Sequence, residues 1–398
     1  MPIFDTKRFA RPETLRQIDS NNLLKLLRRY RRFFADHGME LPACKKGHPK
    51  FDLDFLSQIL ASPDSRPPQE LADALFYINA MSTAEGMDAL LPELNGRQFR
   101  LDAEFSAPAD VALRAWLKDP ELVQRKHAEI FATRPRRFEY FHGAAHPPLP
   151  LPQLTDDRLA RLEGYLDETF FAKGRGRGAK VLPCPGEYEC MFLVRHGDPH
   201  RREGALDGGQ ETSVFYRPLR FDVVGYDSES GILRVHAKST WEKSLYRNGF
   251  GRFLFDALDH FPDSGCYTLE PLRSGAGCLA CGETPPMKCV NLSELHLRLP
   301  GAEGGLLIHR CSDVLASMRR HKQEIPPNAR LEQATFDVFV FGERQPHRVT
   351  IVPPRIARYS DESDNRMMKE WLMLRGFIHG RTGAINESEA TLTLLPSH

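Results

Sequence analysis

The first 172 residues carry their apolar side chains at helical spacing. Between residues 23 and 34 these side chains recur every three or four positions and share one face of a helix. They are Leu23, Leu24, Leu27, Tyr30 and Phe34. Further helices are predicted over 52–60, 71–81, 120–131 and 156–171, and after the cap residue Ser106. Because strand-like alternation is nearly absent before residue 130, residues 1–172 are predicted to form an all-helical domain.

From residue 180 onward the apolar residues alternate with polar ones, as they do in strands. Strands are predicted over 190–195, 220–226, 232–237, 290–298, 305–309, 334–341 and 349–352, with helices over 241–258, 312–321 and 363–375. A proline-rich connector and a glycine-rich basic loop, over 145–153 and 173–180, come before this part. Residues 173–398 are therefore predicted to form a mixed α/β domain that contains a β-hairpin–helix unit. The fold class of the whole chain is α+β.

Composition excludes several classes of protein. The chain has 398 residues, of which 41% are hydrophobic, and a net charge of +1. It is therefore neither a disordered chain nor a polycation that coats nucleic acid by bulk charge. The charge is segregated, because residues 1–50 contain 12 Lys and Arg against 5 Asp and Glu, and the next fifty reverse the sign. Any acidic or nucleic-acid partner must bind a local patch.

The sequence predicts a cytoplasmic protein without a membrane segment. The N-terminal residues have no apolar core behind their positive charges, unlike a secretory signal. No apolar run approaches the roughly 20 residues that span a bilayer. The 8 cysteines are sparse over a long chain, which is typical of a reducing compartment.

One segment of the second domain combines a strand, a tight turn, a strand and an amphipathic helix. Asp222 opens the first strand, and His236 and Lys238 end the second strand two residues apart, so both point the same way. The segment resembles the core of the PD-(D/E)xK nuclease superfamily, in which an acidic residue and a Glu-x-Lys pair hold Mg²⁺ and an activated water.

This resemblance implies a metal-dependent nuclease that uses Mg²⁺ or Mn²⁺, with Asp222 and Lys238 as catalytic residues. His236 stands where an acidic residue is expected, so Glu242 on the following helix is expected to replace it. The alternatives are a nuclease-like fold without activity and an unrelated hairpin–helix unit.

Arg195, His196 and Gly197 end an apolar strand. This Arg-His-Gly motif resembles that of histidine phosphatases, in which the histidine is phosphorylated and the arginine neutralises phosphate charge. The resemblance implies a phosphoester hydrolase built on Arg195 and His196. The alternative is a strand end that leads into a polar basic loop.

Four cysteines form a candidate zinc site. Cys278 and Cys281 are a CxxC pair, whose thiolates can bind one Zn²⁺, and Cys266 and Cys289 would complete a four-cysteine structural site. The alternative is a set of reduced, partly buried thiols.

Basic residues gather in short clusters, including a stripe of Lys25, Arg28, Arg29 and Arg32 opposite the apolar helix face. The others are Arg134, Arg136 and Arg137 beside Phe138 and Tyr140; Arg175 and Arg177; His200, Arg201 and Arg202; and Arg319, Arg320 and Lys322. Each cluster alone is typical of a solvated surface. Together, arginines beside aromatic rings and in flexible loops favour phosphate contacts and base stacking. The predicted nucleic-acid-binding residues are Arg28, Arg29, Arg32, Arg136, Arg137, Arg175 and Arg177.

Neither the nuclease-like nor the phosphatase-like motif is complete, whereas several basic clusters suit binding of a phosphate-rich partner. We therefore predict an interaction or regulatory subunit of a nucleic-acid-handling system, such as a bacterial genome-defence assembly. It would bind a protein partner and a phosphate-rich partner. The alternatives are the metal-dependent nuclease and the phosphoester hydrolase described above.

Overall fold

The computed structural model describes residues 9–42, 49–50, 52–62, 67–95, 107–133, 137–145, 147–186, 189–207, 209–282, 286–301, 304–360 and 365–379. The chain divides into two compact units, Met1–Arg134 and Pro135–His398, which we call the N-terminal unit and the C-terminal unit. The first is helical and the second is rich in antiparallel strands, which confirms the predicted α+β class.

In the N-terminal unit, every regular element of the described residues is an α-helix. The helices are α1 (Pro12–Arg16), α2 (Ser20–Arg28), α3 (Arg31–Asp36), α4 (Leu53–Ala61), α5 (Gln69–Met81), α6 (Ala84–Asn95), α7 (Pro108–Lys118) and α8 (Pro120–Thr133). Capping side chains fix several helix starts: Asp19 accepts hydrogen bonds from the backbone N–H of Asn21 and Asn22 at the start of α2. The apolar helix faces bury one another in a single core.

The helix predicted over residues 23–34 is broken in two. α2 ends at Arg28, and α3 begins at Arg31, after Tyr30 leaves the helical conformation at φ −119° and ψ 30°. Leu27 and Phe34 on either side of the break are both fully buried. The apolar pattern persists across the break because both helices face the same core.

The C-terminal unit contains a ten-stranded sheet in the order β2-β3-β6-β7-β1-β12-β11-β10-β8-β9. Its strands are β1 (Phe138–His142), β2 (Lys180–Pro185), β3 (Glu189–Gly197), β6 (Leu219–Asp227), β7 (Ile232–His236), β8 (Met287–Arg298), β9 (Leu306–Arg310), β10 (Arg330–Val340), β11 (His347–Val352) and β12 (Ile356–Tyr359). Every neighbouring pair is antiparallel. Strands β4 (Arg201–Asp207) and β5 (Gln210–Tyr216) form a separate two-stranded ribbon.

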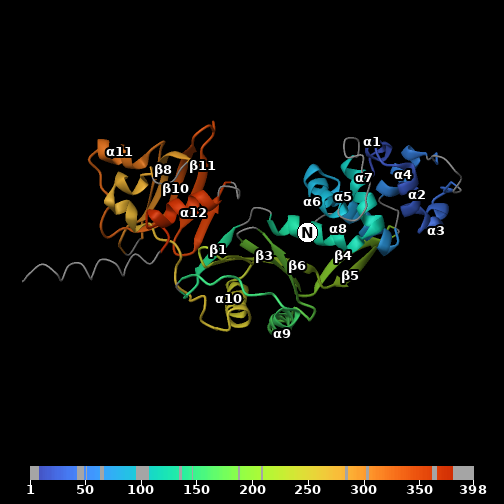
Figure 1. The fold of residues 1–398 in the computed structure, drawn as a ribbon, viewed down its shortest axis with the longest axis horizontal. Helices are drawn as coiled ribbons and strands as arrows, with labels where there is room; N and C mark the ends of the chain where they lie inside the picture. Colours follow the sequence, from blue (N-terminus) through green and yellow to red (C-terminus); the bar gives the residue numbers. More distant parts are fainter. Residues whose placement is uncertain are drawn as a thin grey trace, which may run out of the picture. The chain divides into compact units, whose positions relative to one another are not determined.

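Helices α9 (Asp156–Ala172) and α10 (Thr240–Leu254) pack together on one face of the part of the sheet formed by β2, β3, β6 and β7 (Figure 1). Leu166 and Phe170 of α9 and Tyr246 and Phe250 of α10 are buried there against inward-facing strand residues such as Val224. The layer between these helices and the sheet is the core that holds the candidate site.

The remaining strands carry their own helices. α11 (Val314–Arg320) packs on β8, and Trp371 of α12 (Asn365–Leu374) lies 5.7 Å from the Phe336 ring of β10. Two short 3-10 helices, Glu270–Ser274 and Ala276–Leu279, precede β8. Among the described helices, none combines the length and the apolar character that a membrane crossing requires.

The boundary between the compact units lies at residues 134 and 135, whereas the sequence pattern placed it at 172 and 173. Two elements account for the difference. β1 lies between β7 and β12 in the middle of the sheet, and α9 packs on α10. Both elements therefore belong to the second unit, although they precede residue 173.

Candidate functional site

The predicted strand–turn–strand–helix unit is formed by β6, β7 and α10. The side chain of Asp227 closes the turn by accepting hydrogen bonds from the backbone N–H of Glu229 and Ser230. At the start of α10, the Oε2 atom of Glu242 accepts hydrogen bonds from the backbone N–H and the hydroxyl of Ser239, both at 2.7 Å. Glu242 is thus fixed as part of a capping box.

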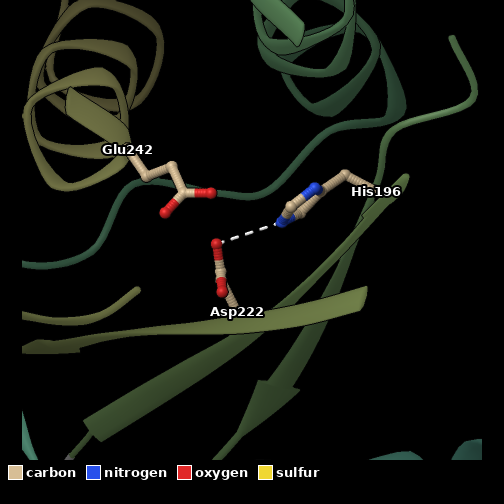
Figure 2. Close-up of side chains that lie close together, drawn as sticks. All are labelled: His196, Asp222 and Glu242. Carbon is tan, nitrogen blue, oxygen red and sulfur yellow. Dashed lines mark hydrogen bonds and ion pairs between the residues drawn. The ribbon is translucent and has the colours of Figure 1, made fainter. Parts of the chain in front are cut away.

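Figure 2 shows His196, Asp222 and Glu242 pointing toward one another from β3, β6 and α10. Nε2 of His196 lies 3.0 Å from Oδ2 of Asp222, and each of these two side chains is only 1% exposed. Nδ1 of His196 lies 2.8 Å from the backbone oxygen of Gly197, so both ring nitrogens face oxygen acceptors.

Aromatic side chains of the two helices enclose this pair. The Phe170 ring stacks on His196 at 4.3 Å between centroids and 10° between planes. The hydroxyl of Tyr246 donates a hydrogen bond of 2.8 Å to Asp222 Oδ2. Burial alone would raise the pKa of Asp222, but the contacts with His196, Arg220 and Tyr246 outweigh burial, and its pKa is lowered.

Three arginines complete the ion-pair cluster. Arg175 places Nη1 2.7 Å from Oε1 of Glu242 and 3.2 Å from Oδ1 of Asp198. Arg220 places Nη2 3.2 Å from Oδ1 of Asp222. The other oxygen of Asp198 lies 3.1 Å from Nη2 of a third arginine, Arg201, at the rim of the cluster. Each carboxylate oxygen of Asp198, Asp222 and Glu242 therefore has a cationic, hydroxyl or backbone partner.

His196, Asp222 and Glu242 are the one group of three or more candidate metal ligands found among the described residues, with ligand atoms within 4.8 Å of one another. Their oxygens are already bonded to arginine, histidine, tyrosine and serine groups, and a buried Mg²⁺ would lie directly against two guanidinium groups. Lys238 is exposed on the short connection before α10. The structure thus brings Asp222 and Glu242 together without Lys238, and the arrangement does not fit a bound magnesium or manganese ion.

The Arg-His-Gly motif is divided between the two faces of the sheet. His196 points into the helix-covered layer, as do Val194 and Phe192 at alternate positions of β3. Arg195 is partly exposed, and as an immediate neighbour in the strand it points to the opposite face. The two side chains that a histidine phosphatase would use therefore do not share one site.

Three loops meet at the outer side of the ion-pair cluster. Nη1 of Arg217 donates hydrogen bonds to the backbone oxygens of Gly174, at 2.6 Å, and Asp198, at 3.1 Å. These bonds join the loop after α9, the β3–β4 loop and the β5–β6 connection. We call residues 173–178, 198–202 and 217–220 the loop junction.

The loop junction presents cations, and aromatic rings of the adjoining α9 and β5 lie against them. Its exposed basic residues are Lys173, Arg177, His200, Arg201 and Arg202. The Arg177 guanidinium lies 4.5 Å from the centre of the Phe171 ring, and His200 stacks on Phe215 at 4.9 Å. Phe171 and Phe215 are 57% and 69% exposed, so both rings can be reached from solvent. Two basic clusters that are separate in the sequence, Arg175 with Arg177 and His200 with Arg201 and Arg202, are thus brought together. Of the two loop arginines predicted to bind nucleic acid, Arg177 is exposed, whereas Arg175 is buried and paired with Glu242.

The other predicted binding residues are not part of the loop junction. Arg28, Arg29 and Arg32 are exposed on α2, its C-terminal cap and α3 of the N-terminal unit, together with Lys25. Arg137 is exposed beside the start of β1, and its backbone oxygen lies 2.9 Å from Nδ1 of His236. Arg136 lies outside the described residues.

The four predicted zinc ligands have different environments. Cys266 is fully buried, and burial raises its pKa to about 12. Burial also raises the pKa of Cys278 to about 11. Cys281 and Cys289 are partly exposed, and the four thiols do not form a metal-ligand group of the kind found at His196. Zinc binding by these cysteines stays a prediction that metal analysis of the purified protein would test.

The sequence patterns missed Arg220, Tyr246 and Asp198. Two of them carried a usable signal: Arg220 is two residues from Asp222 on a strand, and Tyr246 is four residues from Glu242 on a helix, so each shares a face with the predicted site residue. Asp198 lies in a loop, where no periodicity indicates direction. No protein-family model matches the chain, and no curated protein matches it in sequence, so the functional argument rests on these residues.

Proposed function

We propose that the protein binds nucleic acid through the exposed cations of the loop junction. In this proposal the nuclease-like unit acts as a scaffold for binding and not as a metal-dependent nuclease. The observation that carries it is the meeting of two basic clusters, some twenty-five residues apart in the sequence, around Arg217 and Asp198. Such a subunit would work in the cytoplasm, as part of a larger nucleic-acid-handling system.

Charge and ring contacts both support this proposal. Lys173, Arg177 and Arg202 are exposed and can approach phosphate groups, while Arg175 and Arg220 are used inside the protein to balance carboxylates. Exposed Phe171 and Phe215 lie beside these cations and offer faces on which bases can stack. Because stacking requires unpaired bases, we expect single strands to bind more tightly than duplexes.

The test is fluorescence anisotropy with a labelled single strand and a duplex of equal length, measured over a range of salt concentrations. Arg177→Ala/Arg202→Ala should weaken binding to both. If each arginine contacts one phosphate, the slope of log K against log salt should become shallower by about 1.4 for the single strand and about 1.8 for the duplex. The matched control is Arg319→Ala/Arg320→Ala, which removes the same charge from exposed positions at the end of α11.

Three results would overturn the proposal. They are the absence of binding to either oligonucleotide at low salt, an equal loss in the control variant, and binding to poly-glutamate without binding to nucleic acid. A parallel incubation with plasmid DNA and Mg²⁺ or Mn²⁺ tests the scaffold part of the proposal. We expect no cleavage, and cleavage that disappears in Lys238→Ala would restore the nuclease hypothesis.

A further inference from the structure

The centre formed by His196, Asp222 and Glu242 has the layout of a metal site, but arginines contact two of its three side chains. Arg175 contacts Glu242, and Arg220 contacts Asp222 at 3.2 Å and Glu242 at 3.5 Å. The ligand atoms of this centre come from two adjacent strands and the helix that covers them, and they lie within 4.8 Å of one another. Nη1 of Arg175 contacts Oε1 of Glu242 at 2.7 Å, and this pair makes no hydrogen bond of regular geometry. The contact is therefore held mainly by charge.

The charges of the cluster balance without a metal ion. Three carboxylates, those of Asp198, Asp222 and Glu242, face three guanidinium groups, those of Arg175, Arg201 and Arg220. Glu242 is fully buried and Arg175 is about nine-tenths buried, so an additional divalent cation would leave an uncompensated charge in a region of low dielectric.

The backbone around Arg175 is built to place this side chain inside. Gly174 and Gly176 on either side have φ values of 72° and 78°, which favour glycine. The backbone N–H of Arg175 donates to the oxygen of Phe170 at 2.8 Å, and its guanidinium lies 5.0 Å from the centre of the Trp241 ring. Arg177, two residues later in the same loop, is exposed.

We propose that the guanidinium groups of Arg175 and Arg220 together take the place of a divalent cation at His196, Asp222 and Glu242, and that removing Arg175, the partner of Glu242, opens this centre to a cation. The native chain then binds no divalent ion at this centre. The inference does not depend on nucleic-acid binding, because it concerns only the charge balance of the buried cluster.

The experiment compares the full-length chain with Arg175→Ala, using thermal unfolding in EDTA and in millimolar Mn²⁺, together with calorimetric titration of Mn²⁺. The midpoint temperature of thermal unfolding of the native protein should be the same in EDTA and in Mn²⁺. Arg175→Ala should unfold at a lower temperature in EDTA and recover by at least about 2 °C in Mn²⁺, with one ion bound per chain. Arg177→Ala is the matched control, because it removes the same side chain from the same loop, and it should behave like the native protein.

A native chain that binds Mn²⁺ as tightly as Arg175→Ala, or a folded Arg175→Ala that binds none, overturns the proposal. If Arg175→Ala does not fold, Arg175→Ala/Glu242→Gln tests the charge balance on which the proposal rests, because it removes one positive and one negative charge together. We expect this double variant to fold and to show no response to Mn²⁺. A double variant that also fails to fold, or that binds Mn²⁺ tightly, would contradict the ion-pair role of Arg175.

Discussion

Asp222 is the residue on which the buried cluster converges. Its carboxylate accepts a hydrogen bond from the hydroxyl of Tyr246 and lies within hydrogen-bond or ion-pair distance of His196 and Arg220. A buried ion pair is weak support for stability as a whole, because desolvation offsets much of the attraction. Removing one member alone is costly, because it leaves the partner charges buried and uncompensated.

We therefore expect Asp222→Asn to lower the free energy of unfolding at neutral pH by about 3–5 kcal/mol, as found when one partner of a buried pair is removed. The pKa of Asp222 is lowered from its usual 3.8, so its contribution to stability is complete above this value. As the pH falls below 3.8 toward the folded-state pKa, the contribution is progressively lost.

The measurement is denaturant unfolding of the native protein and Asp222→Asn at a series of pH values from neutral to acidic. The difference in the free energy of unfolding between the two proteins should be constant above the unfolded-state pKa of Asp and should become smaller below it. A difference that stays the same in acid would mean that the charge of Asp222 does not provide the stabilisation.

The loop junction depends on a close approach between a strand end and the loop after α9. Gly197 is the last residue of β3, and a Cβ atom there would lie 2.4 Å from the backbone oxygen of Arg175 and 2.6 Å from Cδ of Arg217. Backbone at this distance cannot yield without moving the loop. Gly197 thus sets the position of the loop that carries Arg177.

We expect Gly197→Ala to destabilise the protein by about 1–3 kcal/mol, the usual cost of overpacking, and to weaken nucleic-acid binding because Arg177 is displaced. The measurements are the midpoint of thermal unfolding and anisotropy with a labelled single strand. Gly204→Ala is the matched control, since a Cβ atom at that position of β4 meets nothing within 4 Å. Equal effects of the two substitutions would show that close packing at Gly197 does not position the loop.

The N-terminal unit carries an exposed basic surface of its own. Within the described residues, four cations of this unit make ion pairs, namely Arg16, Arg114, Arg125 and Lys126. The exposed stripe of Lys25, Arg28, Arg29 and Arg32 makes no ion pair with a described carboxylate. A second basic surface is therefore present on a separate unit.

We predict that Arg28→Ala/Arg29→Ala weakens binding of a long single strand but leaves a short one unaffected. A long strand has phosphates to spare after one basic surface is bound, and a second contact made by the same chain would be intramolecular and would raise the overall affinity. The measurement is anisotropy with strands of about 8 and about 40 nucleotides, since a patch of this size covers only a few phosphates. Unchanged affinity for the long strand would show that the stripe is a solvated helix face.

Much of the fold was predictable because its signals are local. The helical spacing of the first 133 residues and the alternation in β6 and β7 reflect which side of one element is buried. The ribbon of β4 and β5 was missed because most of its side chains are exposed, so its sequence has no apolar alternation. The break at Tyr30 was missed because the apolar pattern continues through it.

The sequence by itself determined the α+β class and the strand–turn–strand–helix unit, and it predicted Asp222 and Glu242 as residues of one site. Only the tertiary structure decided that His196 and Asp222 belong to one cluster and that Arg175 enters it while Lys238 stays outside. Strand pairing places β3 beside β6. The loop that follows α9 places Arg175 at the same end of these strands. These contacts join residues far apart in the chain, and periodicity within a single element carries no information about which distant charges will meet.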